Sequence, residues 1–160
     1  MLHRNLNEFC KSIPRNMRIM CLDVGEKRTG IAFSDKTQLI ATAHSVYHRR
    51  NMNKDLGYFN RVLKDNAAGA IVIGLPLEMN EQESAWCGKV IHFANKMVKK
   101  SKVNVYLQDE RLSTFMAIQA LKDSKISFAK SKKIDDKVAA CIILQWTLDK
   151  INTTFSKTIT

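Results

Sequence analysis

The sequence predicts a single α/β domain built on a mixed five-stranded sheet: a three-strand antiparallel meander followed by two parallel strands, with helices on both faces. Two observations lead to this fold class. Three short apolar segments follow one another with only polar turns between them, as in consecutive antiparallel strands. The later apolar segments alternate with helical patterns, as in the crossovers that join parallel strands.

The meander is predicted over residues 18–24, 29–34 and 39–47. The first two segments are apolar, and the polar residues 25–28 separate them. The third segment is rich in Ala, Val and Thr and follows the polar residues 35–37. Each segment has the length of an ordinary strand, and the intervening residues suit tight turns.

Helical and strand patterns alternate in the rest of the chain. Apolar residues at helical spacing predict helices, and short β-branched runs predict strands. In chain order these elements are a helix over 53–66, a strand over 70–74, a helix around 86–97, a strand over 103–107, a helix from Ser113 or Thr114 through Leu121, and a helix over 138–148. The complete order, βββ-α-β-α-β-α-α, is that of ribonuclease-H-like folds, and topology by itself establishes no activity.

The two ends of the chain are expected to flank this domain, which we predict over residues 17–150. An apolar stripe at helical spacing indicates a short helix in the N-terminal extension, residues 1–16, and Pro14 discourages its continuation. The stripe consists of Leu2, Leu6, Phe9 and Ile13. Residues 151–160 are expected to form a C-terminal tail.

The charge balance indicates a polyanionic partner. The chain carries 26 Lys and Arg against 15 Asp and Glu, a net charge of +11, and its pI is near 9.7. Residues 89–133 alone hold eleven basic and three acidic side chains. Because a pI above about 9 is typical of nucleic-acid-binding proteins, we expect nucleic acid as the partner.

The composition argues against secreted and membrane proteins. The four cysteines, Cys10, Cys21, Cys87 and Cys141, have no close-pair spacing, which favours thiols in a reducing compartment. The longest apolar stretch, residues 67–75, is far shorter than the ~20 residues of a membrane-spanning helix. We therefore expect a cytoplasmic protein with no membrane partner.

Three groups of carboxylates are candidates for chemistry. Asp23 interrupts an otherwise apolar strand, where a carboxylate must be paired, hydrogen-bonded or bound to metal. Asp109 and Glu110 follow the last predicted strand, and at most one of them can face a given site because adjacent strand residues point to opposite faces. Asp135 and Asp136 begin the last helix. Turn hydrogen bonds at Asp23 and helix capping at the aspartate pair are structural alternatives.

The positions of these carboxylates suggest one common site. The first and last predicted strands end near Asp23 and Glu110, and sites in open α/β sheets form outside the carboxyl ends of strands. A helix that begins at Asp136 could bring a third carboxylate there. Oxygen donors of this kind suit Mg²⁺ or Mn²⁺, and two such ions would clamp the attacking and leaving oxygens of a phosphodiester. These arguments leave the choice between the two helix-starting aspartates open.

Four motifs, in the right order, resemble the YqgF/RuvX family of bacterial ribonuclease-H-like nucleases. They are LDVGEKRTGIA at residues 22–32, GLPL at 74–77, DERLST at 109–114 and DKVAA at 136–140. The resemblance implies a metal-dependent endonuclease that cleaves phosphodiester bonds at the 5′ end of precursor 16S rRNA. It also implies that Asp23, Glu110 and Asp136 are the catalytic and metal-binding residues, with Asp136 chosen over Asp135 because it lies nine residues before Gln145.

The charge pattern and the resemblance together indicate where nucleic acid, as structured RNA or branched DNA, would bind. The predicted contacts are Gly25, Lys27, Arg28, Lys89, Lys96, Lys100, Arg111, Lys132 and Lys133. Residues 78–81 depart from the Asn and Gly that many family members have in this loop. Resolution of Holliday junctions, which needs a dimer, is the first alternative function. A non-catalytic RNA-binding ribosome-assembly factor is the second, and the chain could be a monomer or a dimer.

Overall fold

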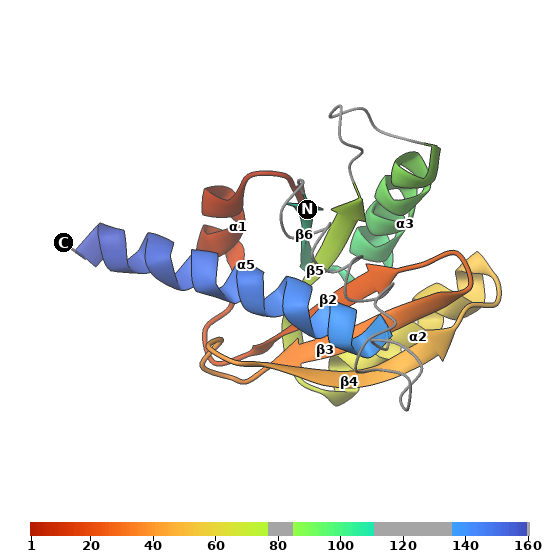
Figure 1. Cartoon of the computed structure of the whole chain (residues 1–160), viewed down its shortest axis with the longest axis horizontal. Coiled ribbons are helices and arrows are strands. Elements are labelled where there is room, and N and C mark those ends of the chain that lie inside the picture. The colour runs from red at the N-terminus through yellow and green to blue at the C-terminus, as the bar shows by residue number, and fades with distance from the viewer. Residues whose placement is uncertain (77–84, 111–135, 160) are drawn as a thin grey trace, which may run out of the picture.

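The computed structural model describes residues 1–76, 85–110 and 136–159. Its strands are β1 Leu2–His3, β2 Arg18–Val24, β3 Arg28–Ser34, β4 Ala41–His48, β5 Ala68–Pro76 and β6 Asn104–Glu110. Its helices are α1 Leu6–Ser12, α2 Met52–Asp65, α3 Ala85–Ser101 and α5 Asp136–Ile159. Within these residues the strands form one six-stranded sheet of order β1-β6-β5-β2-β3-β4 (Figure 1).

The predicted fold class is confirmed, with one strand more than expected. β2, β3 and β4 form the antiparallel meander, while β5 is parallel to β2 and β6 is parallel to β5. The additional strand, β1, pairs in parallel with β6 through Leu2 and His3. Two residues are too few to show the alternation by which a strand is recognised in a sequence.

Both ends of the chain contribute to the fold. The N-terminal helix α1 begins after Asn5, whose side chain accepts a hydrogen bond from the backbone N–H of Glu8 at 3.1 Å. Residues 151–159 continue α5, so this helix is longer than the sequence pattern indicated. Figure 1 shows the C-terminal end of α5 projecting past α1. The helix expected from Ser113 or Thr114 through Leu121 lies outside the described residues.

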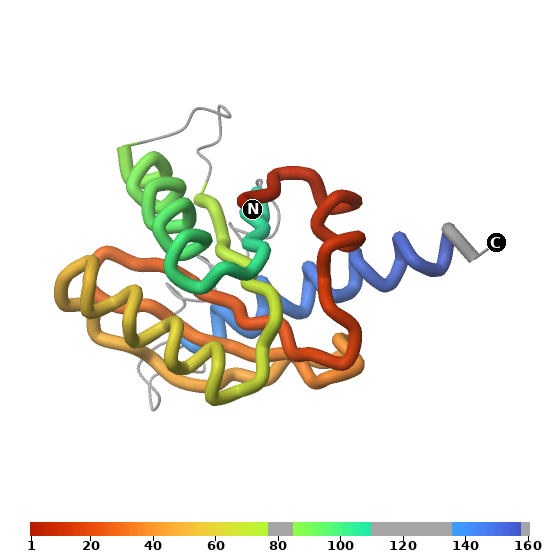
Figure 2. Tube along the Cα trace, turned by 180° about the vertical axis from the view of Figure 1, so that it is seen from behind, coloured from red at the N-terminus to blue at the C-terminus, as the bar shows by residue number. Residues whose placement is uncertain are grey.

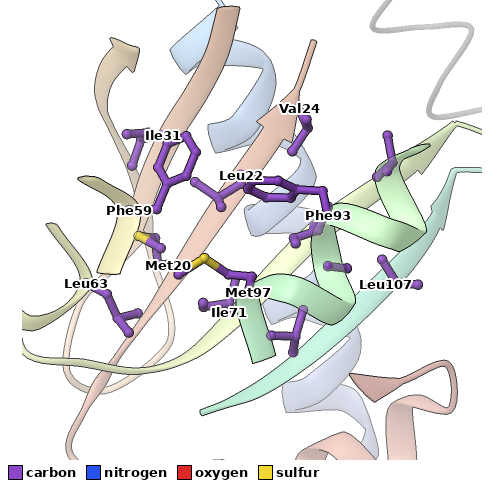
Figure 3. Close-up of a cluster of buried hydrophobic side chains, with 14 of the residues drawn as sticks. Met20, Leu22, Val24, Ile31, Phe59, Leu63, Ile71, Phe93, Met97 and Leu107 are labelled. Carbon is purple, nitrogen blue, oxygen red and sulfur yellow. The ribbon is translucent and has the colours of Figure 1, made fainter. Parts of the chain in front are cut away.

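Helices cover both faces of the sheet, as predicted, and Figure 2 shows α2 and α3 together on one side. On that face Phe59 and Phe93 pack with Met20 and Leu22 of β2 (Figure 3). On the other face, α5 and α1 pack against a second apolar cluster that includes Cys21. No helix in the described ranges combines the length and the hydropathy needed to cross a membrane.

The alternation of β2 decides which face Asp23 joins. Met20 and Leu22 are fully buried under α2 and α3, whereas Ile19 and Cys21 are fully buried in the cluster under α5. Asp23 comes two residues after Cys21, so it lies on the α5 face. It is half-buried there, where the strand ends.

Candidate functional site

Asp23 and Asp136 meet across a single glycine. In the pairing of β2 with β3, Asp23 lies directly opposite Gly30. A Cβ atom at Gly30 would overlap the backbone carbonyl of Asp136 and would lie 2.9 Å from the backbone nitrogen of Lys137. The first residue of α5 therefore rests on the bare β3 backbone. Because opposite residues in antiparallel strands have Cα atoms about 4.5–5.5 Å apart, the fold brings the backbones of Asp23 and Asp136, two of the three predicted site residues, close to the same glycine.

The turn that follows Asp23 is held from both sides. The backbone N–H of Gly25 donates to the Arg28 carbonyl at 2.9 Å, and a Cβ atom at Gly25 would lie 2.5 Å from that oxygen. Arg49, the residue after β4, donates from its guanidinium to the Gly25 carbonyl at 3.0 Å and from its backbone to the Lys27 carbonyl at 2.8 Å. These contacts fix the shape of the loop next to the carboxylate.

A buried carboxylate that the sequence did not indicate holds Arg49 in place. Asp55, in the first turn of α2, is 1% exposed. Its oxygens accept hydrogen bonds from the Tyr47 hydroxyl at 2.9 Å, the Arg50 backbone at 2.9 Å and the Arg49 guanidinium at 3.3 Å. Burial, followed by the bond to Asp55, raises the pKa of Tyr47. In the sequence, an acid near a helix start indicates only a favourable helix dipole, so no local signal marks this network.

Asp136 is paired with Arg28. The Arg28 Nε atom donates to Asp136 Oδ2 at 3.1 Å, and the two side chains are 51% and 23% exposed. Arg28 is predicted from the sequence to bind nucleic acid and Asp136 to bind the metal, and the structure brings these two residues together. The α5 dipole also favours a negative charge at this helix start.

Asp109 and Glu110 lie at the end of β6. Glu110 pairs with Pro76 of β5, and β5 pairs with β2, so Glu110 ends a strand two places from Asp23, as predicted. Asp109 accepts a hydrogen bond from the Arg4 guanidinium at 3.4 Å, which ties it to the segment after β1. Asp109 therefore has a structural partner of its own.

The predicted basic contacts lie in different parts of the fold. Lys27 is exposed in the turn beside Asp23. Lys89 is exposed near the start of α3 and lines a pocket of about 340 Å³ at the carboxyl end of β2. Lys96 and Lys100 lie about 10 and 16 Å further along the axis of α3, so the fold does not bring them to Asp23. Outside the described residues lie Arg111, Lys132, Lys133 and Asp135.

The donor set suits a hard divalent cation. Asp23 and Asp136 offer only oxygen atoms, and Mg²⁺ is commonly held by one or two carboxylates together with water and substrate phosphate. Among the side chains that the structure describes, no group of three His, Cys, Asp or Glu residues could hold a metal ion. The described pair thus supplies part of a site that fits Mg²⁺ or Mn²⁺ better than zinc.

Two solved structures of a Holliday junction resolvase share this fold. RuvC from Thermus thermophilus, solved with a Holliday junction substrate, matches with a TM-score of 0.52 over 87% of this chain and 96% of that chain, at 14% identity. Another structure of Thermus thermophilus RuvC gives a TM-score of 0.50 over 88% and 97% of the two chains. At this identity the likeness shows the fold, which is the ribonuclease-H-like fold of the resolvases.

Sequence similarity gives the family. The RuvX model, described as Holliday junction resolvase, matches residues 17–150. A relative from Wolbachia pipientis wMel is 69% identical over 153 residues, which cover 96% of this chain and 99% of the relative. A relative from Ehrlichia ruminantium strain Welgevonden is 52% identical over 151 residues, which cover 94% and 97%. Both are named "Putative pre-16S rRNA nuclease". The chain belongs to the RuvX family.

Proposed function

We propose that this protein is a cytoplasmic, metal-dependent endonuclease that cleaves phosphodiester bonds in structured RNA, and that its substrate is the 5′ end of precursor 16S rRNA. One observation carries the proposal: the backbone of Asp136 lies against Gly30, and Gly30 is the residue that pairs with Asp23. The glycine lets the backbone of the helix start that carries Asp136 approach the strand beside Asp23, and a metal-dependent nuclease requires oxygen donors that lie close together. The choice of substrate is supported by the names of the relatives.

Glu110 is the third carboxylate of the proposed site. Along β6, Tyr106 belongs to the apolar cluster under α5, and Gln108 accepts a hydrogen bond from the Thr147 hydroxyl of α5 at 3.2 Å. Strand alternation gives position 110 the same parity as these two residues and gives position 109 the opposite parity. This parity supports Glu110, and the pairing of Asp109 with Arg4 supports the same choice.

Asp23, Glu110 and Asp136 would hold Mg²⁺ or Mn²⁺. When bound, the ion supplies Lewis-acid stabilisation of the negative charge that develops on the phosphodiester. Arg28 offsets the charge of Asp136 and orients its carboxylate through the Nε hydrogen bond. Because the guanidinium is half exposed and carries five N–H donors, it can donate to a phosphate oxygen as well.

The RNA contacts nearest the cut are proposed at the turn after Asp23 and at the start of α3. Lys27 and Arg28 place two positive charges beside the carboxylates, and Gly25 keeps the turn compact. Lys89 is a further proposed contact, at the pocket by the carboxyl end of β2. The remaining predicted contacts stay predictions: Lys96, Lys100, Arg111, Lys132 and Lys133.

Resolution of four-way DNA junctions is the second candidate function. The RuvC-like fold and the description of the family model favour it. Junction resolution would use the same carboxylates, but two coordinated cuts require two copies of the site. Substrate preference and oligomeric state therefore separate the two candidates.

The test offers precursor 16S RNA and a synthetic four-way junction side by side, with Mg²⁺ or Mn²⁺ supplied and then chelated. We expect metal-dependent cleavage at the RNA 5′ end and no paired cuts in the junction. Asp23→Asn should abolish cleavage, whereas Asp65→Asn should retain it, because Asp65 is exposed at the end of α2 that leads into the start of β5. Paired junction cuts with intact RNA would establish the resolvase, and cleavage of neither substrate would refute both nuclease functions.

A further inference from the structure

A basic groove runs along the edge of the sheet between β4 and α2. Its volume is about 640 Å³, and the residues that line it include Arg50, Lys54 and Arg61 but no Asp or Glu. All three cationic side chains are exposed. In the part of the chain that the structure describes, none of them forms an ion pair with a carboxylate. We call this feature, with Gly57 at its side, the β4–α2 groove.

The acid in the first turn of α2 does not neutralise the groove. Asp55 is 1% exposed, and its carboxylate accepts hydrogen bonds from the Tyr47 hydroxyl, the Arg49 guanidinium and the Arg50 backbone. Its charge is therefore compensated inside the fold by Arg49. The bond to the Arg50 backbone also fixes the segment from which the Arg50 side chain extends.

Aromatic rings hold a second cation at the groove. Tyr58 stacks on Tyr47 with ring centroids 4.3 Å apart, and the Arg61 guanidinium lies 5.7 Å from the centroid of the Tyr58 ring. A cation–π contact positions a guanidinium without consuming its N–H donors. The donors of Arg61 thus stay available to an anionic ligand.

Gly57 leaves the backbone of α2 open beside the groove. It lies in the interior of α2, lines the groove and has no positive φ. A Cβ atom at this position would meet no other atom within 4 Å. Glycine in a helix interior is less stable than alanine, and nothing in the surrounding fold requires it here. A bare helix backbone beside uncompensated cations suits a ligand that lies flat against the helix.

We propose that the β4–α2 groove binds the sugar–phosphate backbone of the RNA strand that continues beyond the cleavage site. This inference rests on the proposed function. In the strand register, Val46 of the groove lies opposite Gly30, and Gly30 lies opposite Asp23. The groove therefore begins two strand spacings, roughly 10 Å, from the strand of Asp23. A strand that is cut at the carboxylates can pass over the edge strand β4 and place its phosphates on the three cations.

The test is equilibrium binding of a fluorescently labelled single-stranded RNA to the full chain, with chelator present so that no cleavage occurs. The groove variant combines Arg50→Ala, Lys54→Ala and Arg61→Ala. Its matched control removes three exposed cations elsewhere, through Lys11→Ala, Lys36→Ala and Lys99→Ala. Removing three phosphate contacts should reduce the slope of log affinity against log salt by about 2, since each contact to a single strand adds ~0.7. We expect the affinity at low salt to fall about 10- to 100-fold in the groove variant and far less in the control.

The substitution Gly57→Ala changes the shape of the groove without changing its charge. The added methyl group should raise the melting temperature by about 1 to 4 °C, because alanine suits a helix interior better than glycine. The same methyl group occupies the path of the RNA backbone, so affinity should fall although no charge has changed. A more stable variant that binds RNA less tightly is a result that a purely structural role does not produce.

Four outcomes would overturn the groove. They are a wild-type chain that binds no RNA, a groove variant that binds like its matched control, an unchanged affinity in Gly57→Ala, and polyglutamate that binds as tightly as RNA with the same dependence on the three cations. The polyglutamate result would reassign the groove to an acidic protein partner. Binding is measured without metal, so it is independent of cleavage. RNA binding that depends on the groove, with no cleavage, would refute only the proposed nuclease. Cleavage together with binding that does not depend on the groove would refute only the groove.

Discussion

Replacing Gly30 by alanine tests how the carboxylate site is assembled. The added Cβ atom would overlap the carbonyl of Asp136 and lie 2.9 Å from the backbone nitrogen of Lys137. These are backbone atoms, so no side-chain rotation relieves the overlap, and the start of α5 must move away from β3. That movement disturbs the packing of Ala139 and Ala140, which are fully buried against the sheet.

The size of the effect follows from two opposing contributions to the free energy of unfolding. Overpacking a core costs about 1–3 kcal/mol, and the smaller backbone entropy of alanine in the unfolded chain returns about 0.4–1 kcal/mol. The net loss should lower the melting temperature by up to about 10 °C in a chain of this length. Displacing the Asp136 carboxylate by about 1 Å should slow cleavage on the order of 100-fold.

Thermal unfolding and single-turnover cleavage of precursor 16S RNA measure both effects, with cleavage followed at a temperature where every variant is folded. Gly88→Ala is the matched control, because a Cβ atom at Gly88 in α3 meets nothing within 4 Å. This control should melt slightly above the wild type. Gly30→Ala with the wild-type melting temperature and cleavage rate would refute the assembly described here, and reduced stability with intact cleavage would remove Asp136 from the site.

Three further predictions concern charged side chains. Asp55→Asn should lower the free energy of unfolding, measured in urea, by about 3 kcal/mol, because Arg49 keeps its partly buried charge without a carboxylate to compensate it. A loss under about 1 kcal/mol would argue against the network. Arg28→Gln should raise the affinity for Mn²⁺ in an EPR titration, because it removes a cation beside Asp136. An equal or weaker affinity would argue that the carboxylate paired with Arg28 is not a metal ligand. Burial raises the pKa of Asp35, but hydrogen bonds from the next residues outweigh it and lower this pKa to about 2. A lowered pKa gives stability that is present above pH ~4 and lost as the pH falls toward 2, so Asp35→Asn should reduce the acid sensitivity in that window, and identical acid-unfolding curves would contradict this.

Local patterns account for the parts of the fold and site that could be predicted. β2 is a short, nearly continuous apolar run that is buried on both faces, which makes both the strand and the anomaly of Asp23 visible in the sequence. The carboxyl ends of β2 and β6 meet at one edge because parallel crossovers leave few arrangements of the sheet. At the start of α5, position in the chain indicated a carboxylate, and only the family resemblance favoured Asp136 over Asp135.

The packing of one element against the next accounts for what the sequence did not predict. The pairing of Asp55 with Arg49 depends on how α2 packs beside the end of β4, and each residue alone resembles an ordinary surface charge. The cations of the β4–α2 groove gather only once α2 lies along the edge strand. The length of α3 also spreads Lys89, Lys96 and Lys100 along its axis, and their contacts with nucleic acid stay predictions.

If Asp23 and Asp136 hold one metal ion, both carboxylates are needed for full Mn²⁺ affinity, and EPR measures that affinity. The titration compares the wild type with Asp23→Asn, Asp136→Asn, the double variant and the neighbouring control Asp135→Asn. Each of the first two substitutions should weaken Mn²⁺ binding by more than about 10-fold, and the double variant should lose less than the two losses combined, because both remove ligands of the same ion. Asp135→Asn should bind as the wild type does. Wild-type affinity in either Asp23→Asn or Asp136→Asn would contradict a shared site.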